Sequence, residues 1–180
     1  MLIINIFVHL QKAGKMILTN CATEENHEAV IEPITAKDFK IVKKSKDRFA
    51  FDWSMYKDQE VYKLRLKTSD LILGLICLID HTDPETNAIE IELLEVSAEN
   101  TRSTKKWDRI GGCLIAYACR ESFKRGYGGH VFLTPKSYLL EVYPQKYGFI
   151  YVPMKSLARP LGFMVAFDEI SRKLIKKYLD

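Results

Sequence analysis

The sequence has few of the residues that cross-link or interrupt a fold. Its 180 residues include 4 Cys, 9 Gly and 6 Pro. No two cysteines form a CxxC pair, so we expect reduced thiols rather than disulfide or metal-site partners at Cys21, Cys77, Cys113 and Cys119. The low glycine and proline content excludes collagen-like and low-complexity chains, and a hydrophobic fraction of 47% excludes global disorder.

Long apolar runs and the common metal or nucleotide motifs are also missing. The longest apolar stretches reach about ten residues, roughly half of the length that crosses a bilayer. The sequence contains no HExxH, no P-loop and no GxSxG, and its four histidines are isolated from one another. These absences predict a cytoplasmic protein with no membrane span, no dedicated metal site and no Rossmann-type nucleotide site.

The charge balance and the organisation of the chain are those of an ordinary globular domain. A net charge of +4 is compatible with a phosphate-bearing ligand and does not require nucleic acid. A basic run between Lys40 and Arg48 is either the solvated face of a helix or a guide for a polyanion. Without repeats or linkers, we expect an N-terminal extension of uncertain structure at 1–30, with Met16 as an alternative start, and one domain at 31–180.

Hydrophobic periodicity predicts a helix followed by an antiparallel meander. Thr35 and Asp38 have the spacing of a capping box before a helix over 36–46. Alternation over 61–67 predicts a strand with one wet face, the apolar run 71–79 a buried strand, and 88–96 a third strand after a turn at 83–87. Short turns between these three strands make them neighbours in the centre of a sheet.

A second helix opens near Trp107 with two glycines in its first turn. Asp108 is its expected N-cap, and the run from Arg125 to Gly129 ends it. Glycine costs about 1 kcal/mol relative to alanine inside a helix, so Gly111 and Gly112 suggest that a phosphate approaches the unpaired N–H groups there. Packing against a neighbouring element is the other explanation. The remaining elements are expected at 130–133 (strand), 137–144 (helix), 148–152 and 160–167 (strands), and in a C-terminal helix capped by Asp168.

This order of elements, together with two short motifs, resembles the GCN5-related N-acetyltransferase (GNAT) superfamily over residues 61–168. The family's Arg/Gln-x-x-Gly-x-Gly/Ala motif falls on Lys106, Arg109 and Gly111, with Arg109 in place of the usual first glycine. The run from Tyr143 to Phe149 is similar to the ending of the family's fourth helix. The resemblance implies an α/β (α+β) fold, with a mixed, mostly antiparallel twisted sheet flanked by helices and splayed between its fourth and fifth strands.

The resemblance also implies a function and a set of residues. It implies a coenzyme A-dependent N-acetyltransferase in which a primary amine attacks acetyl-CoA directly, through a tetrahedral intermediate. The main chain of Val96 would bind the thioester carbonyl, and Tyr143 would be the general acid, with Tyr147 and Tyr138 as replacements. The pyrophosphate would lie on a set of residues around the helix start: Lys106, Arg109, Ile110, Gly111 and Gly112.

Three carboxylates lie on the strand 88–96, and two of them, Glu90 and Glu92, are candidates for the general base. Period-two geometry places Glu90 and Glu92 on one face and Glu95 on the other. By resemblance the base is Glu90, with a pKa raised by burial, and Glu92 shares its face. Binding of substrate cations or exposure to solvent is the competing interpretation. A loop about six residues longer than usual, centred on 97–104, would border the acyl site.

Two alternatives remain open from the sequence. One is a toxin of the same fold that acetylates aminoacyl-tRNA, which would bind RNA in a salt-sensitive way. The other is a non-catalytic module for acyl-CoA binding or protein interaction. The amine acceptor is not predicted, and a homodimer through the C-terminal strand and helix is plausible.

Overall fold

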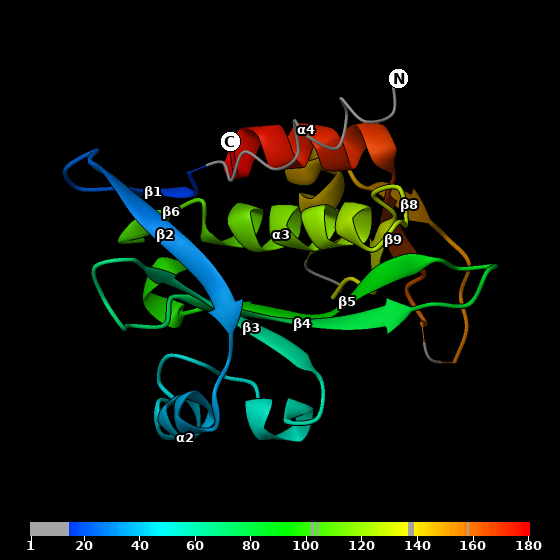
Figure 1. Ribbon diagram of the computed structural model, residues 1–180. Helices are drawn as coiled ribbons and strands as arrows, with labels where there is room; N and C mark the ends of the chain where they lie inside the picture. The colour runs from blue at the N-terminus through cyan, green and yellow to red at the C-terminus, as the bar shows by residue number, and fades with distance from the viewer. Residues whose placement is uncertain (1–14, 102, 104, 137–138, 158) are drawn as a thin grey trace.

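A single mixed sheet organises the chain. The computed structural model describes residues 15–101, 103, 105–136, 139–157 and 159–180 (Figure 1). Its nine strands follow the order β6-β1-β2-β3-β4-β5-β7-β9-β8, in which β5 and β7 are parallel and all other neighbours antiparallel. The expected mixed, mostly antiparallel sheet is therefore confirmed. The strands are β1 (Ile17–Asn20), β2 (Asn26–Pro33), β3 (Glu60–Leu66), β4 (Gly74–His81), β5 (Ala88–Val96), β6 (Trp107–Asp108), β7 (Val131–Leu133), β8 (Ile150–Val152) and β9 (Phe163–Ala166).

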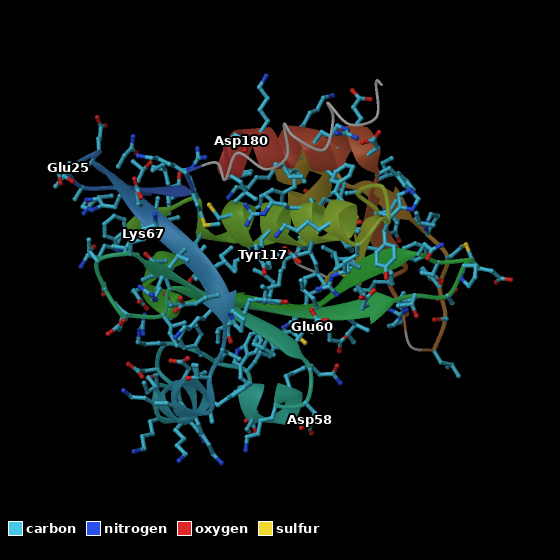
Figure 2. All side chains as sticks on the ribbon, in the orientation of Figure 1. Glu25, Asp58, Glu60, Lys67, Tyr117 and Asp180 are labelled. Atoms are coloured by element: carbon cyan, nitrogen blue, oxygen red, sulfur yellow. The ribbon has the colours of Figure 1, made fainter. Side chains whose placement is uncertain are left out.

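Helices cover both faces of the sheet. Figure 1 shows α3 (Ile110–Lys124) and α4 (Asp168–Tyr178) stacked on one face and α2 (Ala36–Lys44) with the short helix η1 (Trp53–Tyr56) on the other. The larger core lies under α3, where Tyr117 packs on Tyr62 of β3 with ring centroids 5.0 Å apart (Figure 2). The smaller core lies under α2 and includes Val42, Trp53 and Leu93. None of the helices in the described part of the chain is both long and apolar enough to cross a membrane.

Two strands near the N-terminus were not predicted. β2 pairs with β3, and β1 pairs with both β2 and β6. Only Ala29 of β2 is fully buried, so the strand lacks the apolar alternation by which a half-buried strand is recognised. The boundary expected between residues 30 and 31 therefore falls inside β2.

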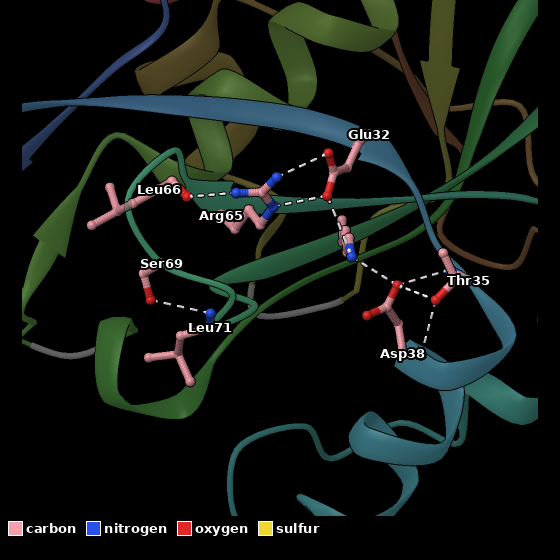
Figure 3. A network of polar contacts seen from close by, with 8 residues as sticks. Glu32, Thr35, Asp38, Arg65, Leu66, Ser69 and Leu71 are labelled. Carbon is pink, nitrogen blue, oxygen red and sulfur yellow. Dashed lines mark hydrogen bonds and ion pairs between the residues drawn. The ribbon is translucent and has the colours of Figure 1, made fainter.

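The capping box of α2 is confirmed, and it belongs to an ionic network (Figure 3). The Thr35 N–H donates to Asp38 Oδ2 at 2.9 Å, and the Asp38 N–H donates to Thr35 Oγ1 at 3.2 Å. Lys63 of β3 donates to Asp38 Oδ2 at 2.7 Å and pairs with Glu32, which also holds Arg65. Because α2 covers this face, the Lys63 side chain is only 12% exposed, and the prediction of a wet face on this strand was wrong there.

The predicted helix caps Asp108 and Asp168 were both wrong. Asp108 belongs to β6, and the N-cap of α3 is Arg109. Asp168 is the first residue of α4, after the N-cap Phe167, and it pairs with Arg172 one turn on. The helix predicted over 137–144 is also different, because the described helical segment here is η4, a π-helical turn at Tyr143–Tyr147. Residues 137 and 138 lie outside the described residues.

A bulge interrupts β5 at Glu92. The pairing Cys77 with Leu93 and Leu78 with Ile91 leaves Glu92 without an opposite residue on β4. Ile91 packs in the core under α3, whereas Leu93 packs in the core under α2. The extra residue thus inverts the faces of the following residues, so that Glu95 lies on the same face as Glu90 and not opposite it, as the uninterrupted period predicted.

Candidate functional site

β5 and β7 separate after a short parallel contact. They pair at three positions only, from Ile89–Val131 to Ile91–Leu133. β5 continues to Val96 beside β4, while β7 ends at Leu133. The Ser97 N–H donates to Leu73 O on the β4 side at 3.0 Å, so the alternation of strand N–H groups turns that of Val96 the other way, toward the gap. The gap therefore offers a main-chain donor at the predicted position.

A cavity of about 1030 Å³ joins this gap to the N-terminus of α3. Its wall combines the end of β5, the start of α3, the end of α4, the turn η4 and the segment that follows α2. Six cationic side chains line it, namely those of Lys46, Arg48, Lys105, Arg109, Lys146 and Lys177, against three acidic ones, those of Asp47, Glu95 and Asp108. The cavity is thus suited to an anionic ligand.

The N-cap residue of α3 has an unusual backbone conformation. Arg109 has φ 77°, in the left-handed region, which costs a residue other than glycine about 1 to 2 kcal/mol. Its side chain offsets this cost, because Nε donates to Ile17 O at 3.1 Å and the guanidinium also binds Lys177 O and lies 5.2 Å from the Tyr178 ring centroid. Arg109 therefore adopts a backbone conformation that ordinarily favours glycine, and its side chain joins β1 to α4.

The two glycines of α3 serve different purposes. A Cβ on Gly112 would lie 2.2 Å from Tyr178 Cε1, so this glycine allows α4 to pack closely on α3. A Cβ on Gly111 would lie 3.2 Å from Tyr147 Oη, inside the cavity. The first-turn N–H groups of Ile110, Gly111 and Gly112 have no acceptor within the helix, and the helix dipole adds partial positive charge there. The start of α3 is therefore suited to an anion, and Gly111 leaves its surface uncovered.

Of the two neighbouring lysines before β6, Lys105 lines the cavity and the predicted Lys106 does not. Lys106 is exposed and lies outside the cavity, and its carbonyl accepts the Cys21 N–H at 2.9 Å. Lys105 Nζ lies 2.6 Å from Asp108 Oδ1. Although burial raises the pKa of Asp108, the hydrogen bonds from Lys105 and the Arg109 N–H hold that pKa below its ordinary value. Asp108 is thus ionised and neutralised by its neighbour.

Two of the three candidate tyrosines line the cavity. The rings of Tyr143 and Tyr147 are 6.0 Å apart, and Tyr143 also contacts Phe149 edge-on at 5.8 Å. Burial, followed by the neighbouring Tyr178, raises the pKa of Tyr147, so its hydroxyl keeps its proton at neutral pH. Tyr138 lies outside the described residues. Both described tyrosines therefore belong to the wall of the cavity, next to the start of α3.

Glu90 and Glu92 do not line the cavity. Glu90 is 8% exposed, its Oε2 is 2.8 Å from His81 Nε2, and its Oε1 accepts from Arg159 at 3.3 Å. Glu92 is exposed in the bulge. Six residues of strand separate Glu90 from Val96, a distance of roughly 20 Å. The structure therefore does not bring either carboxylate to Tyr143.

The cavity carboxylate on β5 is Glu95, to which the sequence assigned no role. It is 8% exposed, and it accepts hydrogen bonds from the Ala50 N–H at 2.6 Å and from Trp53 Nε1 at 2.7 Å. These bonds fix the segment 50–53 as a wall of the cavity. Two features of the sequence could have indicated this role: Glu95 is a carboxylate in an apolar strand, and the indole N–H of a buried tryptophan needs a hydrogen-bond acceptor. Among the described residues, no three His, Cys, Asp or Glu side chains are close enough to hold a metal ion.

Comparison with known proteins gives matches by structure alone. No family model and no curated protein matches the sequence. A crystal structure of a bacterial toxin matches with a TM-score of 0.61 and 10% identity, over 86% of this chain and 98% of that one. A GNAT-family protein from Desulfovibrio desulfuricans matches with a TM-score of 0.55 and 12% identity, over 78% and 99%. A mutant of the toxin AtaT, bound to acetyl-CoA and to the C-terminus of its antitoxin AtaR, matches with a TM-score of 0.53 and 13% identity, over 82% and 98%.

Proposed function

From a chain with the GNAT-like fold, we propose a coenzyme A-dependent N-acyltransferase that transfers an acetyl group from acetyl-CoA to an amine. The observation that carries the proposal is the cavity. It connects a helix N-terminus with cationic surroundings to the gap between β5 and β7. Its volume, about 1030 Å³, is at the upper end of the range for small-molecule sites, as a cofactor-sized molecule requires.

The residues at the start of α3 fit a pyrophosphate. The uncovered N–H groups of the first turn can donate to it, and Gly111 leaves room for its approach. Lys146 and Lys177 line the same cavity, and no carboxylate of the described residues lies within ion-pair distance of either, so their charge is available to a ligand. Arg109 shapes this site through its backbone, because its guanidinium is bound to main-chain carbonyls.

The remaining groups are arranged along the path to the gap. Acetyl-CoA supplies an acyl group already activated as a thioester. The Val96 N–H points to the gap, where it can stabilise negative charge on a carbonyl oxygen. Tyr143 or Tyr147 holds the proton that a departing thiolate takes up, and a buried phenol with a raised pKa carries that proton at neutral pH. We assign Glu95 a positioning role, since main-chain and indole donors occupy its oxygens.

The experiment is a calorimetric titration of the protein with acetyl-CoA, run beside Gly111→Glu. The substitution places a carboxylate where the pyrophosphate should lie, so we expect micromolar binding by the wild type and none by the variant. Lys106→Glu is the matched control, because it adds negative charge nearby but outside the cavity. Failure of the wild type to bind would refute the acyltransferase. Binding without release of the CoA thiol, across a panel of amines and amine-bearing peptides, would indicate the non-catalytic module.

A second candidate acceptor is an amine carried by RNA. The basic side chains of Lys46 and Arg48 line the cavity where the segment after α2 reaches it. AtaT, which has the same fold, has been solved in complex with acetyl-methionyl-tRNA, with a TM-score of 0.53 and 11% identity to this chain. An aminoacyl-tRNA acceptor predicts transfer that weakens steeply with salt and with Lys46→Glu. Transfer to small amines that is insensitive to both changes would decide against it.

A further inference from the structure

A second hollow lies apart from the large cavity, between α2 and η1. It has a volume of about 350 Å³ and shares no residue with the large cavity. Its lining consists of Ile34, Ala36, Phe39, Lys40, Lys43, Ser54 and Lys57. Ala36, Phe39, Lys40 and Lys43 recur at the i, i+3, i+4, i+7 spacing of one helical stripe, so α2 forms one wall as a continuous surface.

The lysines that line this hollow form no ion pairs with the described residues. Among the described residues, no carboxylate lies within ion-pair distance of Lys40, Lys43 or Lys57. Asp52 interacts with Lys43 electrostatically but forms no ion pair with it. The Asp52 carboxylate instead accepts hydrogen bonds from the Ser54 N–H and hydroxyl. Lys63, on the other side of α2, is by contrast paired twice. The hollow therefore combines an apolar floor with three unneutralised cations.

The apolar surface continues outside the hollow on the η1 side. Met55, next to the lining residue Ser54, is 80% exposed. Single exposed apolar residues are common, but this one adjoins a hollow whose floor is formed by Ile34 and Phe39. Lys40 and Lys43 are almost one helical turn apart, which matches the spacing of carboxylates on one face of another helix.

We propose that this hollow is a docking site for an acidic amphipathic helix of a partner protein. One large apolar side chain of the partner would enter the hollow, and carboxylates one turn apart would pair with Lys40 and Lys43, with Lys57 closing the other side. The apolar floor favours a peptide over a phosphate backbone, which has nothing to bury there. The chain's own first residues, 1–14, contain no Asp or Glu and do not supply the complementary charge.

The test is fluorescence anisotropy with a labelled amphipathic peptide of about 14 residues, with Leu and Glu on one face at helical spacing. We expect binding that is weakened about tenfold by Lys40→Glu combined with Lys43→Glu, and by Ala36→Gln, which fills the hollow without changing its charge. Lys124→Glu combined with Lys173→Glu, on α3 and α4, is the matched control and should bind like the wild type. Acetyl-CoA titration of each variant shows that the fold is intact.

Three results would overturn the proposal. The first is equal affinity of the peptide for the wild type and for the Lys40/Lys43 double variant. The second is equal affinity of the protein for the amphipathic peptide and for a peptide of glutamate alone or of scrambled order, which would reduce the site to a generic cationic surface. The third is tighter binding of a single-stranded RNA of equal charge, which would make the surface a nucleic-acid site.

Discussion

The two ends of β5 differ in how their polar groups are satisfied. At the end from Ala88 to Ile91, which we call the closed end, β5 is paired on both edges, and Glu90 is held by His81 and Arg159. At the end from Leu93 to Val96, the open end, β7 has separated, and the start of α3 and the cavity occupy the space. A strand that is fully paired has no main-chain donor left for a ligand. The proposed acyl transfer is therefore assigned to the end where pairing stops.

The largest effect should come from the carboxylate that builds the open end. Glu95→Ala leaves the donors of Ala50, Phe51 and Trp53 without an acceptor. We expect it to lower the free energy of unfolding by about 3 kcal/mol, measured by urea denaturation, and to weaken acetyl-CoA binding. Glu92→Ala, in the exposed bulge, should stay within about 0.5 kcal/mol of the wild type. Equal losses in both variants would contradict the difference between the two positions.

Adjacent glycines at the open end should separate stability from binding. Gly112→Ala drives a methyl group into Tyr178 and should cost about 2 kcal/mol of unfolding free energy. Gly111→Ala meets only the Tyr147 hydroxyl, at 3.2 Å, so it should cost less stability and reduce acetyl-CoA affinity. Thermal denaturation and calorimetry on both variants test this. A Gly111→Ala protein that binds like the wild type would remove Gly111 from the site.

Adjacent lysines provide a charge test of the same end. Lys105→Glu reverses a charge on the cavity wall and frees Asp108 from its partner, whereas Lys106→Glu reverses one outside it. We expect Lys105→Glu to raise the Kd for acetyl-CoA about tenfold, equivalent to about 1.4 kcal/mol, and Lys106→Glu to leave it within about twofold. The reverse order would restore Lys106 to the role that the sequence motif gave it.

The smallest effect is expected at the closed end. Glu90→Gln removes the charge that pairs with His81 and Arg159, which should cost about 1 kcal/mol of stability. Turnover should change by less than about threefold, because Glu90 is remote from the cavity. The turnover of both proteins is measured as the rate of CoA release across pH 6 to 9. A loss of turnover of about a hundredfold that follows the pH profile of a base would assign catalysis to Glu90 and contradict the difference between the two ends.

Much of the fold follows from local patterns in the sequence. The strand 88–96 and the capping box at Thr35 and Asp38 were predicted correctly, because alternation and cap chemistry are properties of consecutive residues. β1 and β2 were not predicted, because β1 is short and β2 is mixed in polarity. Both form strands through pairing with their neighbours in the sheet. The two glycines marked the start of α3, but only the packing of Tyr178 reveals why Gly112 is needed.

The site was less accessible from the sequence for a related reason. Glu90 was selected by resemblance, and a period of two placed Glu92 on its face and Glu95 opposite. That period holds only without a bulge, and a bulge depends on the pairing with β4. The choice of Lys106 over Lys105 followed a motif spacing that the left-handed Arg109 and the short strand β6 change. Tyr147 stands out only once its burial against Tyr178 and its closeness to Gly111 are known. Each of these differences concerns contacts between distant parts of the chain.

The bulge at Glu92 has a consequence for how this molecule can vary. It depends on the number of residues in β5 and not on the identity of any side chain, so a scan of single substitutions would not detect it. Deleting Glu92 would leave Leu93 opposite Cys77 and Glu95 opposite Leu75, and β5 would alternate without interruption, with Glu90 and Glu95 still on one face. The bulge therefore absorbs one extra residue while both ends of β5 keep their pairing with β4. Within β5, this is the position at which the loss of a residue should disturb the open end least.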